Sequence, residues 1–278
     1  MSVCNRLRLT RLLLAFPILV CGIAQGAAPS YSAAGILSVG SYAPGPFAPN
    51  SLISIYGIDL AIGERTTAAS DIVNNTLPTE LNSTRVYIDF VAAPLFYVSK
   101  TQINLLIPGK QALGKAQIQV VREGQTGPVV TIDVAAAAPE LFVNGGYALA
   151  VHGENITSLI TADQPARPGE LIVIYAAGLG KCETMPGNGE LTGYLSELVN
   201  RSTAFRISVN GTTVDARQIF YAGLTPGSAG LYQTNFVLPD NAGADPEVRL
   251  FVGDAGSPVG VKLALRPTPQ QPSDAAGR

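Results

Sequence analysis

The chain of 278 residues contains no tryptophan, two methionines, three cysteines and a single histidine, and only 14% of its residues are charged. One histidine excludes the usual multi-histidine metal centres, and three cysteines cannot build a disulfide-rich scaffold. The low charge excludes a coiled coil and a charged disordered chain. Glycine and proline are instead abundant, at 29 and 20 residues. This composition favours a β protein in which turns separate short strands.

The first 26 residues have the pattern of a signal peptide. Arg6, Arg8 and Arg11 precede an apolar run over residues 12–24, which is too short to cross a bilayer. Small residues at the end of this segment predict cleavage after Gly26. The mature protein is therefore predicted to be secreted, periplasmic or on the cell surface.

Cleavage changes what the rest of the chain can do. Residues 1–26 hold three arginines and no acid, so the mature chain is more acidic than the formal net charge of −2. An acidic chain without basic patches is not expected to bind nucleic acid. Cys182 is the one mature thiol, which precludes an internal disulfide. No later apolar run reaches about 18 residues, so no membrane span is predicted after cleavage.

Two stretches of the sequence repeat in the same order. Residues 49–60 and 168–179 each contain a proline-led turn, an apolar run that ends in Ile-Tyr, and a second turn before leucine. Residues 97–108 are matched by 221–239, where a longer glycine-rich loop interrupts the second copy. Repetition in a fixed order at a spacing of about 120 residues indicates two homologous domains.

We place the two domains at residues 27–136 and 137–266. The joint near residues 135–139 is short and apolar, which predicts domains that are packed together rather than freely tethered. The proline-rich residues 267–278 are predicted to form a disordered tail.

The secondary structure is predicted to be almost entirely β. Apolar and more polar residues alternate over 85–90, 205–209 and 247–252, which is the pattern of a half-buried strand. Six or seven such short strands per half, separated by glycine and proline turns, indicate an immunoglobulin-like sandwich. We therefore predict an all-β chain of two tandem immunoglobulin-like (TIG-type) β-sandwich domains.

The repeated segments resemble an uncharacterised family of secreted or surface bacterial proteins, abundant in acidobacteria, that carry a tandem immunoglobulin-like region. The Pro-Gly-x-x-Ile-x-Ile pattern is also similar to the TIG (IPT) class. The matching segments are residues 49–60, 77–81, 93–99, 101–104, 137–142, 168–180, 221–227 and 230–235. The resemblance implies the fold and an exterior location, and it implies no activity. Asn82-Ser83 stands where this family usually has a glycine pair, so we expect a different turn there.

The residues offer little for catalysis, metal binding or a cofactor. A catalytic triad would need His152, which we expect on an exposed loop, and the Gly-x-Ser-x-Gly motif is absent. Cys182 is expected to be a loop or semi-buried thiol without a histidine partner. The acidic cluster at 240–245 lacks the alternating spacing of a calcium loop. We predict no catalytic residue, no metal site and no cofactor.

Two amide pairs are the candidate ligand-binding residues. Gln102 and Asn104 are two residues apart on a predicted strand, and so are Gln233 and Asn235, so each pair shares one face of its sheet. Such amides could bind sugar hydroxyls or a further strand. They could equally satisfy backbone groups of a neighbouring loop, and duplication favours that structural interpretation.

The predicted function is a non-enzymatic binding, adhesion or scaffold module whose partner is an unknown protein or a surface glycan. A carbohydrate-binding accessory module is the first alternative, and a hydrolase is a disfavoured second one. The long polar loops that follow Leu60 and Gly180 occupy matching places in the two halves. Paired long loops on a sandwich are where binding is commonly found.

Overall fold

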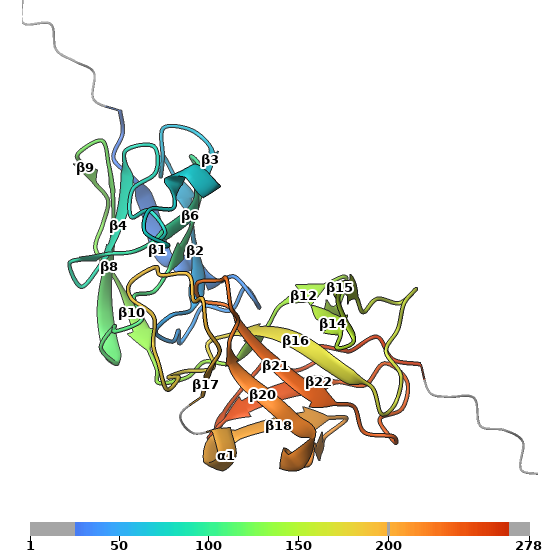
Figure 1. The fold of residues 1–278 in the computed structure, drawn as a ribbon. Helices are drawn as coiled ribbons and strands as arrows, with labels where there is room; N and C mark the ends of the chain where they lie inside the picture. The colour runs from blue at the N-terminus through green and yellow to red at the C-terminus, as the bar shows by residue number, and fades with distance from the viewer. Residues whose placement is uncertain (1–25, 199–200, 267–278) are drawn as a thin grey trace, which may run out of the picture.

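The computed structural model describes residues 26–198 and 201–266 (Figure 1). The predicted signal peptide lies outside this range except for Gly26, and so does the predicted tail, 267–278. Two β-sandwiches follow one another along the chain, each around its own hydrophobic core. The predicted all-β class with tandem immunoglobulin-like sandwiches is confirmed. Within the described range, no helix is long and apolar enough to cross a membrane.

The first sandwich pairs two antiparallel sheets over a core that runs from Tyr31 to Val134. Its first sheet has the order β1 (Ser30–Ser38), β2 (Leu52–Ile58), β7 (Gln102–Leu106), β6 (Leu95–Val98) and β3 (Arg65–Thr66). Its second sheet has the order β10 (Val130–Val134), β8 (Gly114–Arg122), β4 (Thr84–Ile88) and β5 (Val91–Ala92), with β9 (Gln125–Thr126) paired to β8. A short 3-10 turn, η1 (Ala69–Asp71), follows β3.

The second sandwich repeats this plan over a core that runs from Leu141 to Leu265. Its first sheet has the order β15 (Asn155–Leu159), β14 (Ala150–His152), β16 (Leu171–Ala177), β21 (Tyr232–Val237), β20 (Ile219–Leu224) and β17 (Ser196–Glu197), with β11 (Glu140–Leu141) paired to β16. Its second sheet has the order β19 (Thr212–Thr213), β18 (Phe205–Val209), β22 (Val248–Val252) and β23 (Ala255–Gly256). The small elements are α1 (Arg201–Ala204), η2 (Ala216–Gln218) and the hairpin β12 (Val143–Asn144)–β13 (Tyr147–Ala148).

The strand registers show how closely the two sandwiches correspond. Tyr56 pairs with Gln102 between β2 and β7, and Tyr175 pairs with Gln233 between β16 and β21. A β-bulge interrupts the next strand in both copies, at Phe96 in β6 and at Phe220 in β20. Because these pairings match the sequence repeat, the residues of β2, β6 and β7 have identifiable counterparts in β16, β20 and β21.

Two turns place residues other than glycine in the left-handed region of the backbone. Asn50 has a φ of 61°, and Gly169, its counterpart after the repeated proline, has a φ of 73°. Asn82 and Ser83 have φ values of 45° and 53°, which is the left-handed region that a glycine pair occupies without cost. Asn82 and Ser83 therefore hold a backbone conformation that glycine adopts more readily.

The two sandwiches are packed against each other, as the short apolar joint predicts. The junction loop, which we define as residues 178–195 between β16 and β17, reaches back onto the first sandwich. The backbone N–H of Leu77 donates to the carbonyl of Gly189, and the N–H of Leu191 donates to the carbonyl of Asn75, both at 2.9 Å. These bonds extend the sheet-like contact across the junction and fix the two sandwiches relative to each other.

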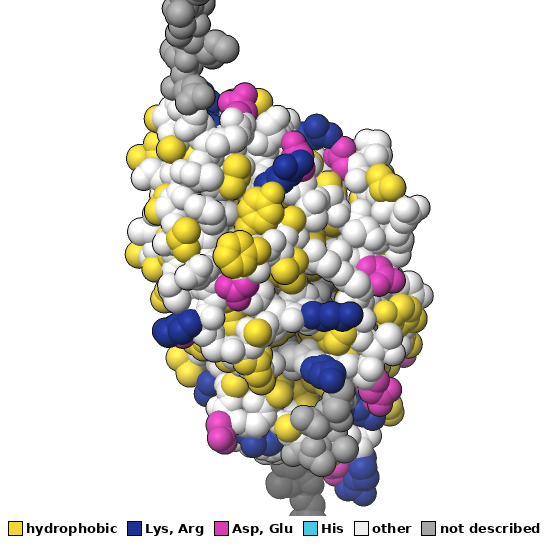
Figure 2. All heavy atoms as spheres, turned by 90° about the vertical axis from the view of Figure 1, so that its left-hand side faces the viewer, with side chains coloured by type: hydrophobic (Ala, Val, Ile, Leu, Met, Phe, Trp, Pro, Cys, Tyr) yellow, Lys and Arg dark blue, Asp and Glu magenta, His cyan; other side chains and the backbone are white. Residues whose placement is uncertain are grey.

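An apolar cluster seals the junction. Leu77 and Leu106 of the first sandwich are buried with Ala229 of the second, and Phe96 and Leu191 pack against them. On the face shown in Figure 2, basic and acidic side chains are scattered among apolar and uncharged ones rather than gathered by sign.

Candidate functional site

The amide pair of the first sandwich is held in place by a chain of hydrogen bonds on the outer face of its sheet. Gln102 Nε2 donates to Asn104 Oδ1 at 2.7 Å, and Ser54 Oγ donates to the same oxygen at 2.8 Å. Ser54 lies directly opposite Asn104 across β2 and β7. Both bonds end on Asn104 Oδ1. In the described structure, the N–H groups of Asn104 Nδ2 and the side-chain carbonyl of Gln102 can therefore bind a further partner.

A groove of about 570 Å³ opens beside this pair, and we call it the amide groove. Besides the two amides, it is lined by Thr66, Thr67, Phe96, Tyr97 and Leu191, among others. No residue that lines it carries a charge. A second hollow of about 480 Å³ shares Phe96 and Leu191 with the amide groove and continues along the junction. The concave surface thus runs from the first sheet to the second sandwich.

The junction hollow is more apolar than the amide groove. Phe142, Leu149, Tyr175 and Leu231 of the second sandwich line it. Phe142 and Leu149 flank the β12–β13 hairpin, which stands where β1 of the first sandwich has only a bulge between Tyr31 and Ile36. An insertion in the second repeat therefore supplies part of this wall.

The second amide pair has a different setting. Gln233 Nε2 donates to Asn235 Oδ1 at 3.2 Å, but the residue opposite Asn235 is Val173, which has no hydroxyl group. Neither amide lines the amide groove or the junction hollow. The sequence pattern treats the two pairs as equal, but the structure places Gln102 and Asn104 in the amide groove and Gln233 and Asn235 outside both hollows.

The position of one edge strand explains this difference. β17 pairs with Gly223 and Leu224, whereas β3 pairs with Tyr97 and Val98, two residues earlier in the repeat. In the second sandwich Tyr221, the counterpart of Tyr97, is 6% exposed, and burial raises its pKa to about 12. Tyr97 is only half-buried and lines the groove.

The bonds of both amide pairs run within their own sheets. Gln102 and Asn104 join to each other and to β2, and Gln233 joins to Asn235. The hydrogen bonds therefore do not support the interpretation in which these amides hold a loop against the sheet. Sequence reasoning missed Ser54, which the strand register alone would have placed opposite Asn104. Leu191 was not singled out either, although it lies in the long loop after Gly180, where binding was expected.

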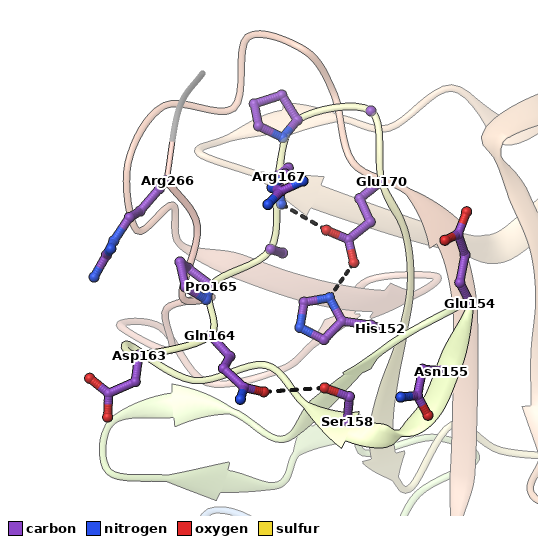
Figure 3. A pocket seen from close by; sticks show the side chains of 13 residues that line it. His152, Glu154, Asn155, Ser158, Asp163, Gln164, Pro165, Arg167, Glu170 and Arg266 are labelled. Carbon is purple, nitrogen blue, oxygen red and sulfur yellow. Dashed lines mark hydrogen bonds and ion pairs between the residues drawn. The ribbon is translucent and has the colours of Figure 1, made fainter. Parts of the chain in front are cut away.

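A concavity of about 1190 Å³ surrounds His152 at the far end of the second sandwich (Figure 3). The expectation of an exposed loop histidine is wrong: His152 ends β14, pairs with Ile172 of β16, and has a side chain that is 22% exposed. Its Nδ1 contacts Glu170 Oε1, and the other oxygen of Glu170 accepts the backbone N–H of Arg167 at 2.9 Å. Glu170 thus fixes the orientation of the ring.

Neither His152 nor Cys182 has the surroundings of a catalytic residue. Ser158 faces the same concavity as His152, but its hydroxyl donates to Gln164 Oε1 at 3.2 Å (Figure 3). Cys182 is fully buried rather than semi-buried, and burial raises the pKa of its thiol to about 12. A thiol in this state is protonated and inaccessible at neutral pH.

The acidic residues do not gather around a possible metal ion. Over residues 26–198 and 201–266, no three His, Cys, Asp or Glu side chains lie close enough together to hold one. In the cluster singled out from the sequence, Asp245 accepts the backbone N–H of Leu265 at 3.2 Å and the hydroxyl of Tyr147 at 3.3 Å. These bonds give its carboxylate a structural use.

The sequence matches no protein-family model and no curated protein. Among solved structures, it is similar to SGBP-B of a mixed-linkage glucan utilization locus of Bacteroides ovatus, in complex with a heptasaccharide (11% identity, 80% of this chain and 43% of that chain, TM-score 0.31). It is also similar to SGBP-B of a xyloglucan utilization locus of Bacteroides uniformis (10%, 86% and 50%, TM-score 0.26) and to the tandem Ig repeats of Dlar (11%, 87% and 96%, TM-score 0.21). The chain spans at most half the length of either SGBP-B chain. Similarities of this size carry no inference about this chain.

Proposed function

We propose that this chain is an exported, non-enzymatic binding module of the tandem TIG-like kind, with domains at 27–136 and 137–266, and that its amide groove binds a neutral glycan. The observation that carries the proposal is the hydrogen-bond chain from Ser54 through Asn104 to Gln102 inside an uncharged groove. The signal peptide pattern of residues 1–26 supports export.

The groove offers the groups that a sugar ring needs. Sugar hydroxyls both donate and accept, and here Asn104 Nδ2 would donate while the Gln102 carbonyl would accept. The Thr67 hydroxyl donates to the carbonyl of Leu95 at 2.7 Å, so its oxygen can still accept. The rings of Phe96 and Tyr97 supply apolar surface for the carbon–hydrogen face of a sugar.

The absence of charge among the lining residues favours a neutral ligand over an acidic one. A uronate or sulfate group would enter this groove without a cationic partner and would lose hydration that nothing replaces. The same argument disfavours glycoside hydrolysis, because that reaction canonically uses two carboxyl groups beside the bond that is cleaved. No carboxylate lines the amide groove.

The test is binding of neutral oligosaccharides to the mature chain, residues 27–278, by glycan array and titration calorimetry. A panel of glucan, xylan, mannan and galactan oligosaccharides is the probe. We expect Asn104→Ala and Gln102→Ala each to weaken binding about tenfold or more, which corresponds to ~1.4 kcal/mol. Asn235→Ala and Gln233→Ala are matched controls from the other repeat, and we expect them to bind as the parent does. Absence of binding across the panel, or equal loss in all four variants, would refute the proposal.

A further inference from the structure

Each sandwich has two different ends. The end at which β2 or β16 finishes is called the leading end of its sandwich. The end at which the same strand begins is called the trailing end. At the junction, the leading end of the second sandwich covers the trailing end of the first. Within residues 26–198 and 201–266, the leading end of the first sandwich and the trailing end of the second are covered by no other sandwich, and they lie at opposite ends of the molecule (Figure 1).

The covered trailing end has a defined apolar surface. Leu52 pairs with Leu106 between β2 and β7, and Phe96 stands at the adjacent bulge of β6. The three side chains pack beneath Leu191 and Ala229 of the second sandwich. Leu106 is 1% exposed as a result. This trio is therefore the receiving surface of the internal junction.

The open trailing end carries the same trio. Leu171 pairs with Val237 between β16 and β21, in the register of Leu52 and Leu106. Phe220 stands at the matching bulge of β20. Phe220 is 59% exposed, while Leu171 and Val237 are half-buried. The ring of Phe220 thus stands at the position that matches Phe96 of the receiving surface, but without a sandwich over it in the described structure.

The polar part of the junction also has an open counterpart. Ser38 pairs with Ile53 in the first sandwich, and His152 pairs with Ile172 in the second, so the two residues are equivalent. Ser38 Oγ contacts the carboxylate of Glu140, which belongs to the sandwich that follows. His152 instead contacts Glu170 of its own sandwich and lines the large open pocket of Figure 3.

The last segment of each sandwich also forms the same kind of backbone pairing at its trailing end. Phe47 forms a parallel bridge with Val134 just before the joint, and Ala166 forms the matching bridge with Leu265. The pocket of Figure 3 therefore occupies the region that, in the first sandwich, lies under the next sandwich.

The open leading end presents apolar side chains that suit this surface. At the junction, the loop that follows β16 carries Leu191 onto the first sandwich. The loop that follows β2 is its counterpart. It exposes Ile62 at 47%, and the last residue of the strand, Ile58, is 66% exposed. Both sandwiches also open with the same Ala-Ala-Pro sequence, at 27–29 and 137–139. The free leading end thus shares the apolar strand end and the following loop of the docked one, but not its β12–β13 hairpin.

We propose that the trailing end of the second sandwich binds the leading end of the first sandwich of another copy of this chain. The contact would follow the end-to-end arrangement of the internal junction, with Phe220, Leu171 and Val237 receiving Ile58 and Ile62 in place of Leu191 and Ala229. Because the two surfaces differ, the contact is head-to-tail, and such contacts build open chains unless the rotation closes them into a ring. This inference is independent of the amide groove, which lies at neither open end.

The test is the concentration dependence of mass for residues 27–278, by sedimentation velocity and light scattering. We expect mass to rise with concentration beyond that of a dimer. Phe220→Ser and Ile58→Ser should each weaken association at least about tenfold. Phe90→Ser is the matched control, because Phe90 is 91% exposed at the turn between β4 and β5, where its neighbours Asp89 and Val91 lie beside the junction loop rather than at either open end. Thermal melting of each variant checks that the fold is kept, and Phe220→Asp serves as a second variant at that position.

Mixing the two variants distinguishes the possible contacts. A head-to-tail contact predicts that Phe220→Ser and Ile58→Ser chains, each monomeric alone, form dimers together, since each supplies the surface that the other lacks. If Ile58→Ser alone associates like the parent while Phe220→Ser does not, two trailing ends are meeting and the proposal is wrong. A parent chain that stays monomeric at every concentration, or a Phe90→Ser variant that loses association, also overturns it.

Discussion

Ser38 and Glu140 join the two sandwiches through a hydrogen bond in which a serine hydroxyl of one repeat donates to a carboxylate of the next. Ser38 is 2% exposed and Glu140 is 8% exposed. Burial raises the pKa of the Glu140 carboxyl, and the hydroxyl groups of Ser38 and Ser41 offset only part of that rise. An acid that ionises reluctantly therefore lies in the middle of the junction.

This acid predicts a pH-dependent contribution to stability. Because the pKa of Glu140 is raised in the folded state, folding favours the protonated form, and the contribution is lost as pH rises through the folded pKa. Glu140→Gln mimics the protonated form at every pH. We expect the free energy of unfolding of the parent, relative to that of Glu140→Gln, to fall as pH rises from 4 to 7. Urea titrations of both proteins across that range measure it. A difference that stays constant or grows with pH would contradict the assignment.

The repeat supplies a matched pair for testing the junction. Leu106 is buried beneath the second sandwich, whereas its counterpart Val237 is half-buried at the open end. We expect Leu106→Ala to lower the free energy of unfolding by ~2–5 kcal/mol, the usual range for truncating a buried leucine. Val237→Ala should cost about 1 kcal/mol or less. Denaturant unfolding at low protein concentration, where copies do not associate, makes the comparison. Equal losses would mean that the junction does not bury Leu106 in solution.

Much of the architecture could be predicted from the sequence, because its signals are local and duplicated. The alternation of apolar and polar residues over 205–209 predicts a strand, and the repeated segments that end in Ile-Tyr predict two domains. Neither prediction needs knowledge of tertiary contacts. The amide pairs were identifiable because residues two apart on a strand share a face. Their different surroundings were not, since these depend on where β3 and β17 join their sheets. The edge strands are two residues long and carry no periodic pattern.

The His152 pocket illustrates the same limit. Nothing near His152 in the sequence indicates that Glu170, 18 residues later, lies against its ring. That contact arises because β14 and β16 pair as antiparallel neighbours. Between them, the chain first forms β15 on the other side of β14 and then returns to β16 through the turn at Pro168. Likewise, the long loop after Gly180 was predicted to bind something, and the structure shows that it binds the other half of the same chain. Partner identity depends on how the two sandwiches are packed, which no local pattern encodes.

The tyrosine pair Tyr221 and Tyr97 gives the last prediction. The Tyr221 hydroxyl accepts the backbone N–H of Ser196 at 3.1 Å and lies 2.7 Å from the carbonyl of Leu224, to which it donates. These bonds attach the short edge strand β17 to its sheet and are buried.

Removing the hydroxyl in Tyr221→Phe leaves a buried N–H and a buried carbonyl without their partner, which costs ~1–3 kcal/mol. In a chain of this size we expect the melting midpoint to fall by about 2–4 °C per kcal/mol. Tyr97→Phe is the matched control, and we expect its midpoint to stay within about 1 °C of the parent's, because Tyr97 is half-buried in the open groove. Calorimetric scans of the three proteins decide the question: if the two variants melt together, β17 is not held by Tyr221, and the edge strand does not account for the different settings of the two amide pairs.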